Sequence, residues 1–450
     1  MRTYAMPALR VLVLKVEQPA LAARFLGSLV SGDPTTPQLT TAAAWSVKPE
    51  SCVNIAFTHA GLVALQLSAG SLESFPEDFR EGAVARAGRI GDTGDSAPET
   101  WKGGLAGSDV HALLIVFAQS EAELDSVTAR LRAALSDGPA FSEISVHEGR
   151  ALEGNVAHFG YRDGFAQPTI DGGLPAMLPD VLPKAPAGAF LLGHESQYEG
   201  FTYPVPAPAD QLGQNGSFVA FRILEQDCHG FEEFLTAAAQ QTGLDRELIA
   251  AKLCGRWRNG VPLALSPETP DPTLPVEKYN SFDYTPTEAL PDAYDDKRGY
   301  RCPIGAHIRR MNPRHAVVAG NSGLKRRIVR RGLPYGPPYD PANPHDGIER
   351  GLLGIFIGVS LKDQFEFLMA DWSNKGSFAP GLRGTRDPVI GDNPDGATFL
   401  MPVEGGKTVE ITGLSRFVRC RGSAYAFLPS VTAIKFLSTL PAGRAAALSV

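Results

Sequence analysis

The sequence predicts an α+β protein with antiparallel sheets and peripheral helices, arranged as two strand–helix–strand–strand–helix–strand modules. Three observations predict this fold class. Short apolar runs alternate with segments of helical periodicity, the same order of elements occurs twice within 450 residues, and long Pro/Gly-rich connections separate the elements of the second half. We expect the first module to span residues 1–210 and the second to span residues 211–450.

The first module is predicted from four strands and two helices. The predicted strands are residues 9–16, 53–57, 110–118 and 141–147, and the predicted helices are residues 18–30 and a helix that begins at Ser120. Residues 110–118 are continuously apolar, which indicates a strand buried on both faces. Ser120 is followed three residues later by Glu123, which is a capping-box pattern at a helix start.

The second module repeats this order less regularly. The predicted strands are residues 218–224, 352–361, 417–420 and 424–428, and the predicted helices are residues 231–241 and 362–372. The connections at residues 178–208, 261–298 and 333–347 are rich in proline. Loops of this length inside a compact protein are usually functional, so we expect them to cover a large ligand.

Composition narrows the classes of partner and compartment. The net charge of -7 argues against nucleic acid or an anionic membrane as the main partner, and no apolar run approaches the ~20 residues that span a bilayer. Five cysteines without a CxxC pair indicate reduced thiols rather than a disulfide framework. No secretory signal is visible, so a cytoplasmic location is expected. The first predicted strand begins so near residue 1 that further residues are also expected to precede it.

The first chemical motif surrounds His307. Arg309, Arg310 and Arg314 follow it within seven residues. A neutral imidazole is a common ligand of metals and of haem iron. Arginine pairs bidentately with carboxylates, so Arg309 and Arg314 are expected to bind an anionic cofactor such as a haem through its propionates. The alternative is a structural histidine on a basic, solvated face.

The second motif is a turn with one carboxylate. Asp163 lies in residues 160–164, between two glycines that permit unusual backbone angles and close approach to a ligand. A carboxylate in that position is a candidate acid–base group. The alternative is an Asx turn with no chemical role.

The third motif interleaves basic and apolar residues at positions 325–336. A strand here would direct Arg330 and Arg331 to opposite faces, one of them toward a pocket. The alternatives are a charged edge strand and a nucleic-acid contact, which the acidic total disfavours.

In this order and spacing, the three motifs resemble the dye-decolorizing peroxidases. Residues 160–164, 302–314 and 330–336 carry the resemblance, and residues 191–193 and 351–368 are similar to the longer members, which include fungal enzymes and bacterial relatives. The resemblance extends over nearly the whole chain. It implies two ferredoxin-like modules, with haem b bound in the second.

The resemblance also implies residue roles. His307 would be the proximal iron ligand, Asp163 the distal acid–base residue and Arg330 the distal arginine, with Arg331 as the alternative. Hydrogen peroxide would be the oxidant, and dyes, phenolics and other small aromatic reductants the electron donors. A homo-oligomer is compatible with this reading, and neither nucleic acid nor membrane is an expected partner.

Further residues follow from these roles. Leu352 and Phe356 match the strand that lines the distal pocket, although Gly354 departs from the bulky residue of some relatives. A carboxylate is expected to bind the second nitrogen of His307, and Asp387 is the candidate, with Asp392 and Asp395 as competitors.

Trp372 and Tyr335 are candidates for oxidising bulky dyes at the surface. Two other functions remain open at this point: a haem carrier or sensor without turnover, which would need neither distal residue, and a haem-free module that binds a small anion.

Overall fold

The computed structural model describes residues 4–41, 43, 45–136, 138–164, 166–173, 178–318 and 320–440. Its strands are β1 (Ala8–Val16), β2 (Ser51–Phe57), β3 (Ala112–Ala118), β4 (Phe141–Arg150), β5 (Ser217–Gln226), β6 (Val317–Val318), β7 (Asn321–Ser322), β8 (Val329–Tyr335), β9 (Gly351–Gly358), β10 (Ala397–Val403), β11 (Lys407–Leu414) and β12 (Val418–Leu428). Its α-helices are α1 (Pro19–Ser28), α2 (His59–Ala64), α3 (Ala69–Glu73), α4 (Glu77–Arg86), α5 (Glu121–Leu135), α6 (Cys228–Thr242), α7 (Arg246–Cys254), α8 (His307–Met311) and α9 (Val431–Leu437).

One antiparallel sheet organises the molecule, with the strand order β4-β1-β3-β2-β12-β5-β9-β8. Each half of this order contains four strands of the sheet. Counted along the chain, they lie side by side as fourth, first, third and second. The halves meet where Phe57 pairs with Phe427. The two end strands, β4 and β8, lie close together: the backbone of Gly149 on β4 packs against Leu333 on β8. The sheet is therefore curled, and the predicted α+β class is confirmed. The boundary at residues 210 and 211 stays a prediction.

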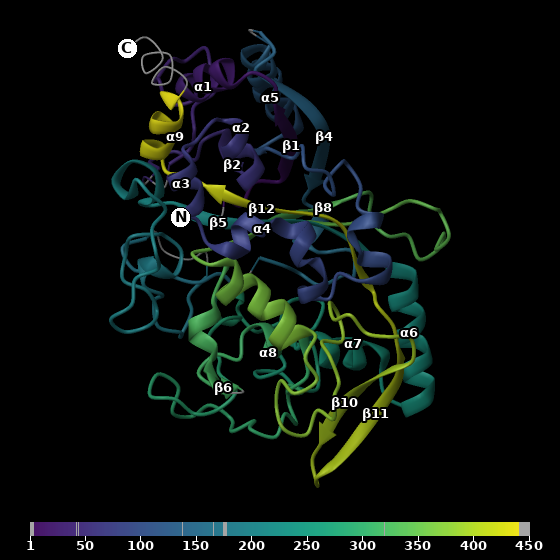
Figure 1. Cartoon of the computed structure of the whole chain (residues 1–450). Helices are drawn as coiled ribbons and strands as arrows, with labels where there is room; N and C mark the ends of the chain where they lie inside the picture. The colour runs from purple at the N-terminus through teal and green to yellow at the C-terminus, as the bar shows by residue number, and fades with distance from the viewer. Residues whose placement is uncertain are drawn as a thin grey trace, which may run out of the picture.

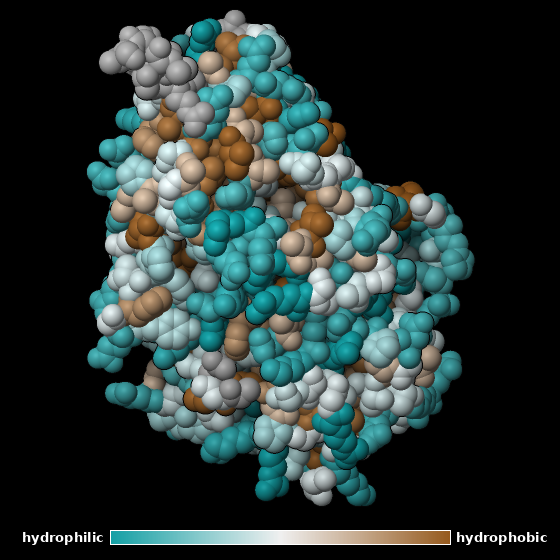
Figure 2. All heavy atoms as spheres, viewed as in Figure 1, coloured by the Kyte–Doolittle hydropathy of each residue, from teal (hydrophilic) through white to brown (hydrophobic). Residues whose placement is uncertain are grey.

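Helices lie toward both ends of the molecule, and α4 lies between them, where it packs against the central strand β12. Figure 1 shows α1, α5 and α9 at one end, with α6, α7, α8 and the β10–β11 hairpin at the other. The face seen there is largely hydrophilic, and its apolar side chains gather in the upper part of the view (Figure 2). Within the described ranges, none of the helices combines the length and the apolar character needed to cross a bilayer.

The predicted elements occur in the predicted places, with two corrections. The two strands predicted at residues 417–420 and 424–428 are one strand, β12, which begins at Val418. A bulge in β12 leaves Arg421 without a partner opposite it and so breaks the alternation of side chains. Residues 362–372 form two successive π-helical turns, η9 (Leu361–Glu366) and η10 (Leu368–Ser373), rather than one α-helix. Wide turns of this kind are frequent at functional sites.

The β8–β9 hairpin and α8 position the site. Arg330 on β8 lies opposite Phe356 on β9 in the register of the sheet. The short helix α8 begins at His307, and Ala306 precedes it in extended conformation. Both segments border the same cavity.

Candidate active site

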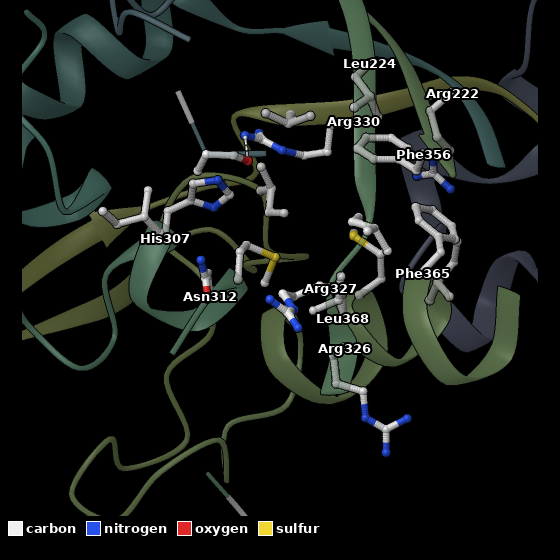
Figure 3. Close-up of a pocket in the computed structure, with 18 of the residues that line it drawn as sticks. Arg222, Leu224, His307, Asn312, Arg326, Arg327, Arg330, Phe356, Phe365 and Leu368 are labelled. Atoms are coloured by element: carbon white, nitrogen blue, oxygen red, sulfur yellow. Dashed lines mark hydrogen bonds between the residues drawn. The ribbon is translucent and has the colours of Figure 1, made fainter. Parts of the chain in front are cut away.

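A cavity lies between the β8–β9 hairpin, helix α8 and the two π-helical turns. Its walls are mainly apolar, and they include Leu224, Leu352, Phe356, Phe365, Leu368 and Met369. Figure 3 shows His307 on one side of this space, with Phe356 and Phe365 across from it. A flat apolar ligand would contact apolar side chains on one face and an imidazole on the other.

His307 is oriented by a buried carboxylate. Its Nδ1 donates to Asp387 Oδ2 at 2.9 Å, and the Asp387 side chain is fully buried. Asp387 Oδ1 also accepts from the backbone N–H groups of Val389 and Ile390, at 2.8 and 3.0 Å. Burial by itself would raise the pKa of Asp387, but His307, the Ile390 N–H and Arg310 together hold this pKa below its usual value.

This contact confirms Asp387 as the partner of His307. Of the competitors, Asp392 pairs with Arg386 at 2.8 Å, and Asp395 is exposed. With its proton on Nδ1, His307 keeps the lone pair of Nε2, and no described residue donates a hydrogen bond to that atom. The free Nε2 is the atom that an iron ion would require.

Arg330 and Asp163 form a pair beside this cavity. Arg330 Nη1 lies 3.7 Å from Asp163 Oδ1, and the two side chains are 37% and 50% exposed. Arg330 lines the main cavity together with His307, and it also lines an adjoining cavity whose wall includes Asp163. Arg330 therefore lines both cavities, whereas His307 lines the main cavity and Asp163 lines the adjoining one.

The turn that carries Asp163 is shaped by a glycine and by a hydrogen bond from the next backbone N–H. Gly164 has a φ of 90°, and its N–H donates to Asp163 Oδ1 at 2.7 Å. Asn155 Nδ2 donates to the Asp163 carbonyl at 2.9 Å. An Asx turn bonds the backbone N–H two residues further on, so this contact with the next residue does not show one. Asp163 Oδ2 is the oxygen with no described hydrogen bond.

Leu352 and Phe356 also lie where the sequence predicts them, in the wall of the main cavity. The next position of interest on the same strand is Gly354. A Cβ atom there would lie 2.6 Å from the Phe356 ring, so the absence of a side chain lets this ring lie back over the strand. Arg331 faces the adjoining cavity instead of the main one and lies over the Tyr4 ring, at 4.2 Å from its centroid.

Arg309 and Arg314 do not line the main cavity, which corrects the prediction that they bind a carboxylate-bearing cofactor. Arg309 is buried and donates to Asp296 Oδ2 at 3.0 Å and to the carbonyl of Cys302. Arg314 is also buried and donates to the carbonyl of Phe282 at 2.7 Å. Both side chains thus donate to protein oxygens, and these bonds fix the loops behind α8.

Arg327 is a cavity residue that the sequence prediction missed. Its Nε donates to Leu324 O at 3.0 Å and its Nη1 to Pro183 O at 2.6 Å. Burial lowers the pKa of Arg327 to about 10, and Asp180 opposes this effect only in part. Figure 3 shows Arg327 at the side of the cavity away from Arg330. A carboxylate in the cavity would relieve the cost of burying this cation.

These observations fit haem. The cavity offers a free imidazole nitrogen, apolar walls for a porphyrin and the half-buried guanidinium of Arg327 for a propionate. Arg222, which also lines the cavity, is already neutralised by a buried bidentate pair with Asp92, with one bond of 2.7 Å. Arg327 is therefore the better propionate partner of the two.

The predicted surface oxidation sites lie outside this cavity. Trp372 is only 1% exposed and packs against Phe367 and Phe378. Tyr335 is half-buried and donates to Glu349 Oε1 at 3.1 Å. A role of either residue in dye oxidation stays a prediction.

Comparisons with known proteins identify related sequences. Residues 33–156 match the family model described as the DyP dimeric alpha+beta barrel domain. The chain is 30% identical over 414 residues to a dye-decolorizing peroxidase of Mycena epipterygia, covering 88% of this chain and 74% of that protein. It is 31% identical over 432 residues to Peroxidase 2 of Mycetinis scorodonius, covering 89% and 78%.

Solved structures give the same result. A fungal DyP-type peroxidase from Auricularia auricula-judae superposes with a TM-score of 0.80 at 26% identity, covering 97% of both chains. A dye-decolorizing peroxidase in complex with 2,6-dimethoxyphenol superposes with a TM-score of 0.79 at 25% identity, also covering 97% of both chains.

Proposed function

Because this chain belongs to the dye-decolorizing peroxidase family and is therefore a peroxidase, we propose that it binds haem b in the main cavity and uses hydrogen peroxide to oxidise dyes, phenolics or similar aromatic donors. The observation that supports this assignment best is the His307–Asp387 pair, which leaves Nε2 of the imidazole free toward an apolar cavity bordered by Arg330. When bound, haem would supply the redox chemistry: two electrons would pass to hydrogen peroxide, and the aromatic donor would then replace them.

His307 and Asp387 act from one side of the cavity. In this proposal, His307 Nε2 would hold the haem iron. The Nδ1–H bond to buried Asp387 fixes the ring orientation and increases electron donation from the imidazole. Arg327, which lines the cavity, would hold a propionate of the haem.

Asp163 acts from the other side. Its carboxylate accepts a proton from hydrogen peroxide and returns it to the oxygen that leaves as water. The half-exposed position of Asp163 in the adjoining cavity gives peroxide access to that carboxylate. The guanidinium of Arg330 is positioned to stabilise negative charge that develops as the O–O bond breaks.

The donors proposed for this chain are small aromatic reductants. The wall of the adjoining cavity combines apolar residues such as Phe117 and Leu333 with Arg330. One structural neighbour was solved with 2,6-dimethoxyphenol, which is a donor of this class. Larger dyes would require oxidation at the protein surface.

The test of the proposal is the absorption of haem in the purified protein. The holoprotein is expected to show a Soret band that changes on addition of hydrogen peroxide, and His307→Ala is expected to weaken or abolish this band. Arg309→Met is the matched control, because it changes a residue of the same helix that does not face the cavity. A normal haem spectrum in His307→Ala would remove His307 as the ligand.

A further inference from the structure

We propose that Gln167 is a positioning residue of the peroxide reaction, whose side-chain amide holds Arg330 and thereby the Asp163–Arg330 pair in place. The inference rests on the proposed function, because that function assigns proton transfer and charge stabilisation to this pair. Gln167 lines both the main cavity and the adjoining one, so it lies at the boundary where the pair acts.

The amide of Gln167 bonds to the main chain of Arg330 in both directions. Gln167 Nε2 donates to Arg330 O at 2.8 Å, and Arg330 N donates to Gln167 Oε1 at 3.1 Å. Strand β8 is an edge strand, with β9 as its neighbour in the sheet order. An edge strand presents backbone N–H and C=O groups that no neighbouring strand satisfies. The side-chain amide therefore acts as a one-residue substitute for a neighbouring strand, at the residue that carries the distal guanidinium.

The same loop also contacts the guanidinium of Arg330. Arg330 Nη2 donates to the carbonyl of Ala166 at 3.3 Å, and Nη1 lies 3.7 Å from Asp163 Oδ1. Asp163, Ala166 and Gln167 thus contact three separate parts of one arginine: its Nη1, its Nη2 and its main chain. A displacement of the loop from β8 would change all three contacts together.

The ion pair is too weak to hold this arrangement by itself. Its atoms are 3.7 Å apart, beyond direct hydrogen-bond distance, and both side chains are more than a third exposed. Exposed pairs of this kind contribute little and leave long side chains free to move. The two Gln167 bonds are shorter and fix the main chain, where a small displacement is transmitted to the whole side chain. Gln167 is therefore the contact that sets the distance between Asp163 and Arg330.

The test is a double-mutant cycle on the haem-loaded enzyme, measured by stopped-flow mixing with hydrogen peroxide. Gln167→Met keeps the length of the side chain and removes both hydrogen bonds. It is expected to lower the second-order rate constant for peroxide by about tenfold, since small misplacements of a reacting group have effects of this size or larger. The KM for peroxide should rise, and the KM for the aromatic donor should not change.

The cycle separates positioning from general structural damage. If Gln167 acts through Arg330, Gln167→Met has no further effect in an Arg330→Leu background. Gln197→Met is the matched control, because Gln197 Nε2 donates to the Lys325 carbonyl at 3.0 Å but Gln197 borders neither cavity. This control should react with peroxide as the wild type does.

Two results would overturn the inference: a Gln167→Met enzyme with the wild-type peroxide rate, or a loss that multiplies with the loss from Arg330→Leu. If Gln167→Met does not yield folded holoprotein, Gln167→Glu applies the same test, because it keeps an acceptor for Arg330 N and removes the donor to Arg330 O. A wild-type protein without a haem band or without any peroxide reaction would instead refute the proposed function.

Discussion

Replacement of Asp163 by asparagine separates the chemical role of this residue from its structural one. The Asp163–Arg330 pair is 3.7 Å long and its side chains are 50% and 37% exposed, so its loss should cost less than about 1 kcal/mol of folding free energy. Asparagine keeps an oxygen that can accept from the Gly164 N–H, now at 2.7 Å, so the turn should persist. Loss of a positioned proton acceptor typically costs ~10²–10⁴ in rate, which is about 3–5 kcal/mol in the activation barrier.

The assay is the rate at which the haem absorption changes after mixing with hydrogen peroxide, with thermal unfolding of the same samples. We expect a fall of at least about a hundredfold in the peroxide rate, with haem retained and stability nearly unchanged. Asp171→Asn is the matched control, because Asp171 Oδ1 also accepts from the N–H of the following glycine, at 3.1 Å, yet borders neither cavity. A rate for Asp163→Asn within about threefold of this control would refute the assignment of Asp163 as the proton acceptor.

Three other substitutions test the surroundings of the site. Arg327→Met should weaken haem binding by about 10–100-fold in a haem-transfer assay, because a charge-assisted bond to a propionate is lost; unchanged affinity would exclude that contact. Asp387→Asn should reduce haem affinity by about 10–100-fold by weakening the bond to His307 Nδ1, whereas retention of full affinity would argue against this orienting role. Asp92→Ala should lower the free energy of unfolding by about 3–5 kcal/mol in urea titrations, because Arg222 would be left buried without its partner; joint replacement of both residues by apolar ones should restore most of the loss.

Regular elements were predictable from sequence where one physical pattern dominates a segment. The continuous apolar run of β3 and the capped amphipathic start of α5 are local properties, and the structure places both within a few residues of the prediction. The Ser120 side chain does accept from the Glu123 N–H, as the capping pattern requires. The π-helical turns at η9 and η10 were not predictable, because their composition is that of an ordinary α-helix.

The short helices α2, α3 and α4 and the β10–β11 hairpin were also missed. Helices of five or six residues, such as α2 and α3, are too short to show a hydrophobic period. In the hairpin, β11 is mostly exposed and has few apolar residues. Its sequence pattern therefore cannot be distinguished from that of a loop. Its stability comes from pairing with β10, which only the tertiary structure provides.

The sequence by itself predicted the main strands and helices, because local periodicity depends on neighbouring residues. Its three motifs, through their resemblance to a family, pointed to His307, Asp163 and Arg330. Only the tertiary structure decided which arginine borders the cavity and which carboxylate binds the histidine. Arg309 turns to Asp296 while Arg327 lines the cavity. A long cationic side chain can reach in many directions, and the oxygens that select one of them lie far away along the chain.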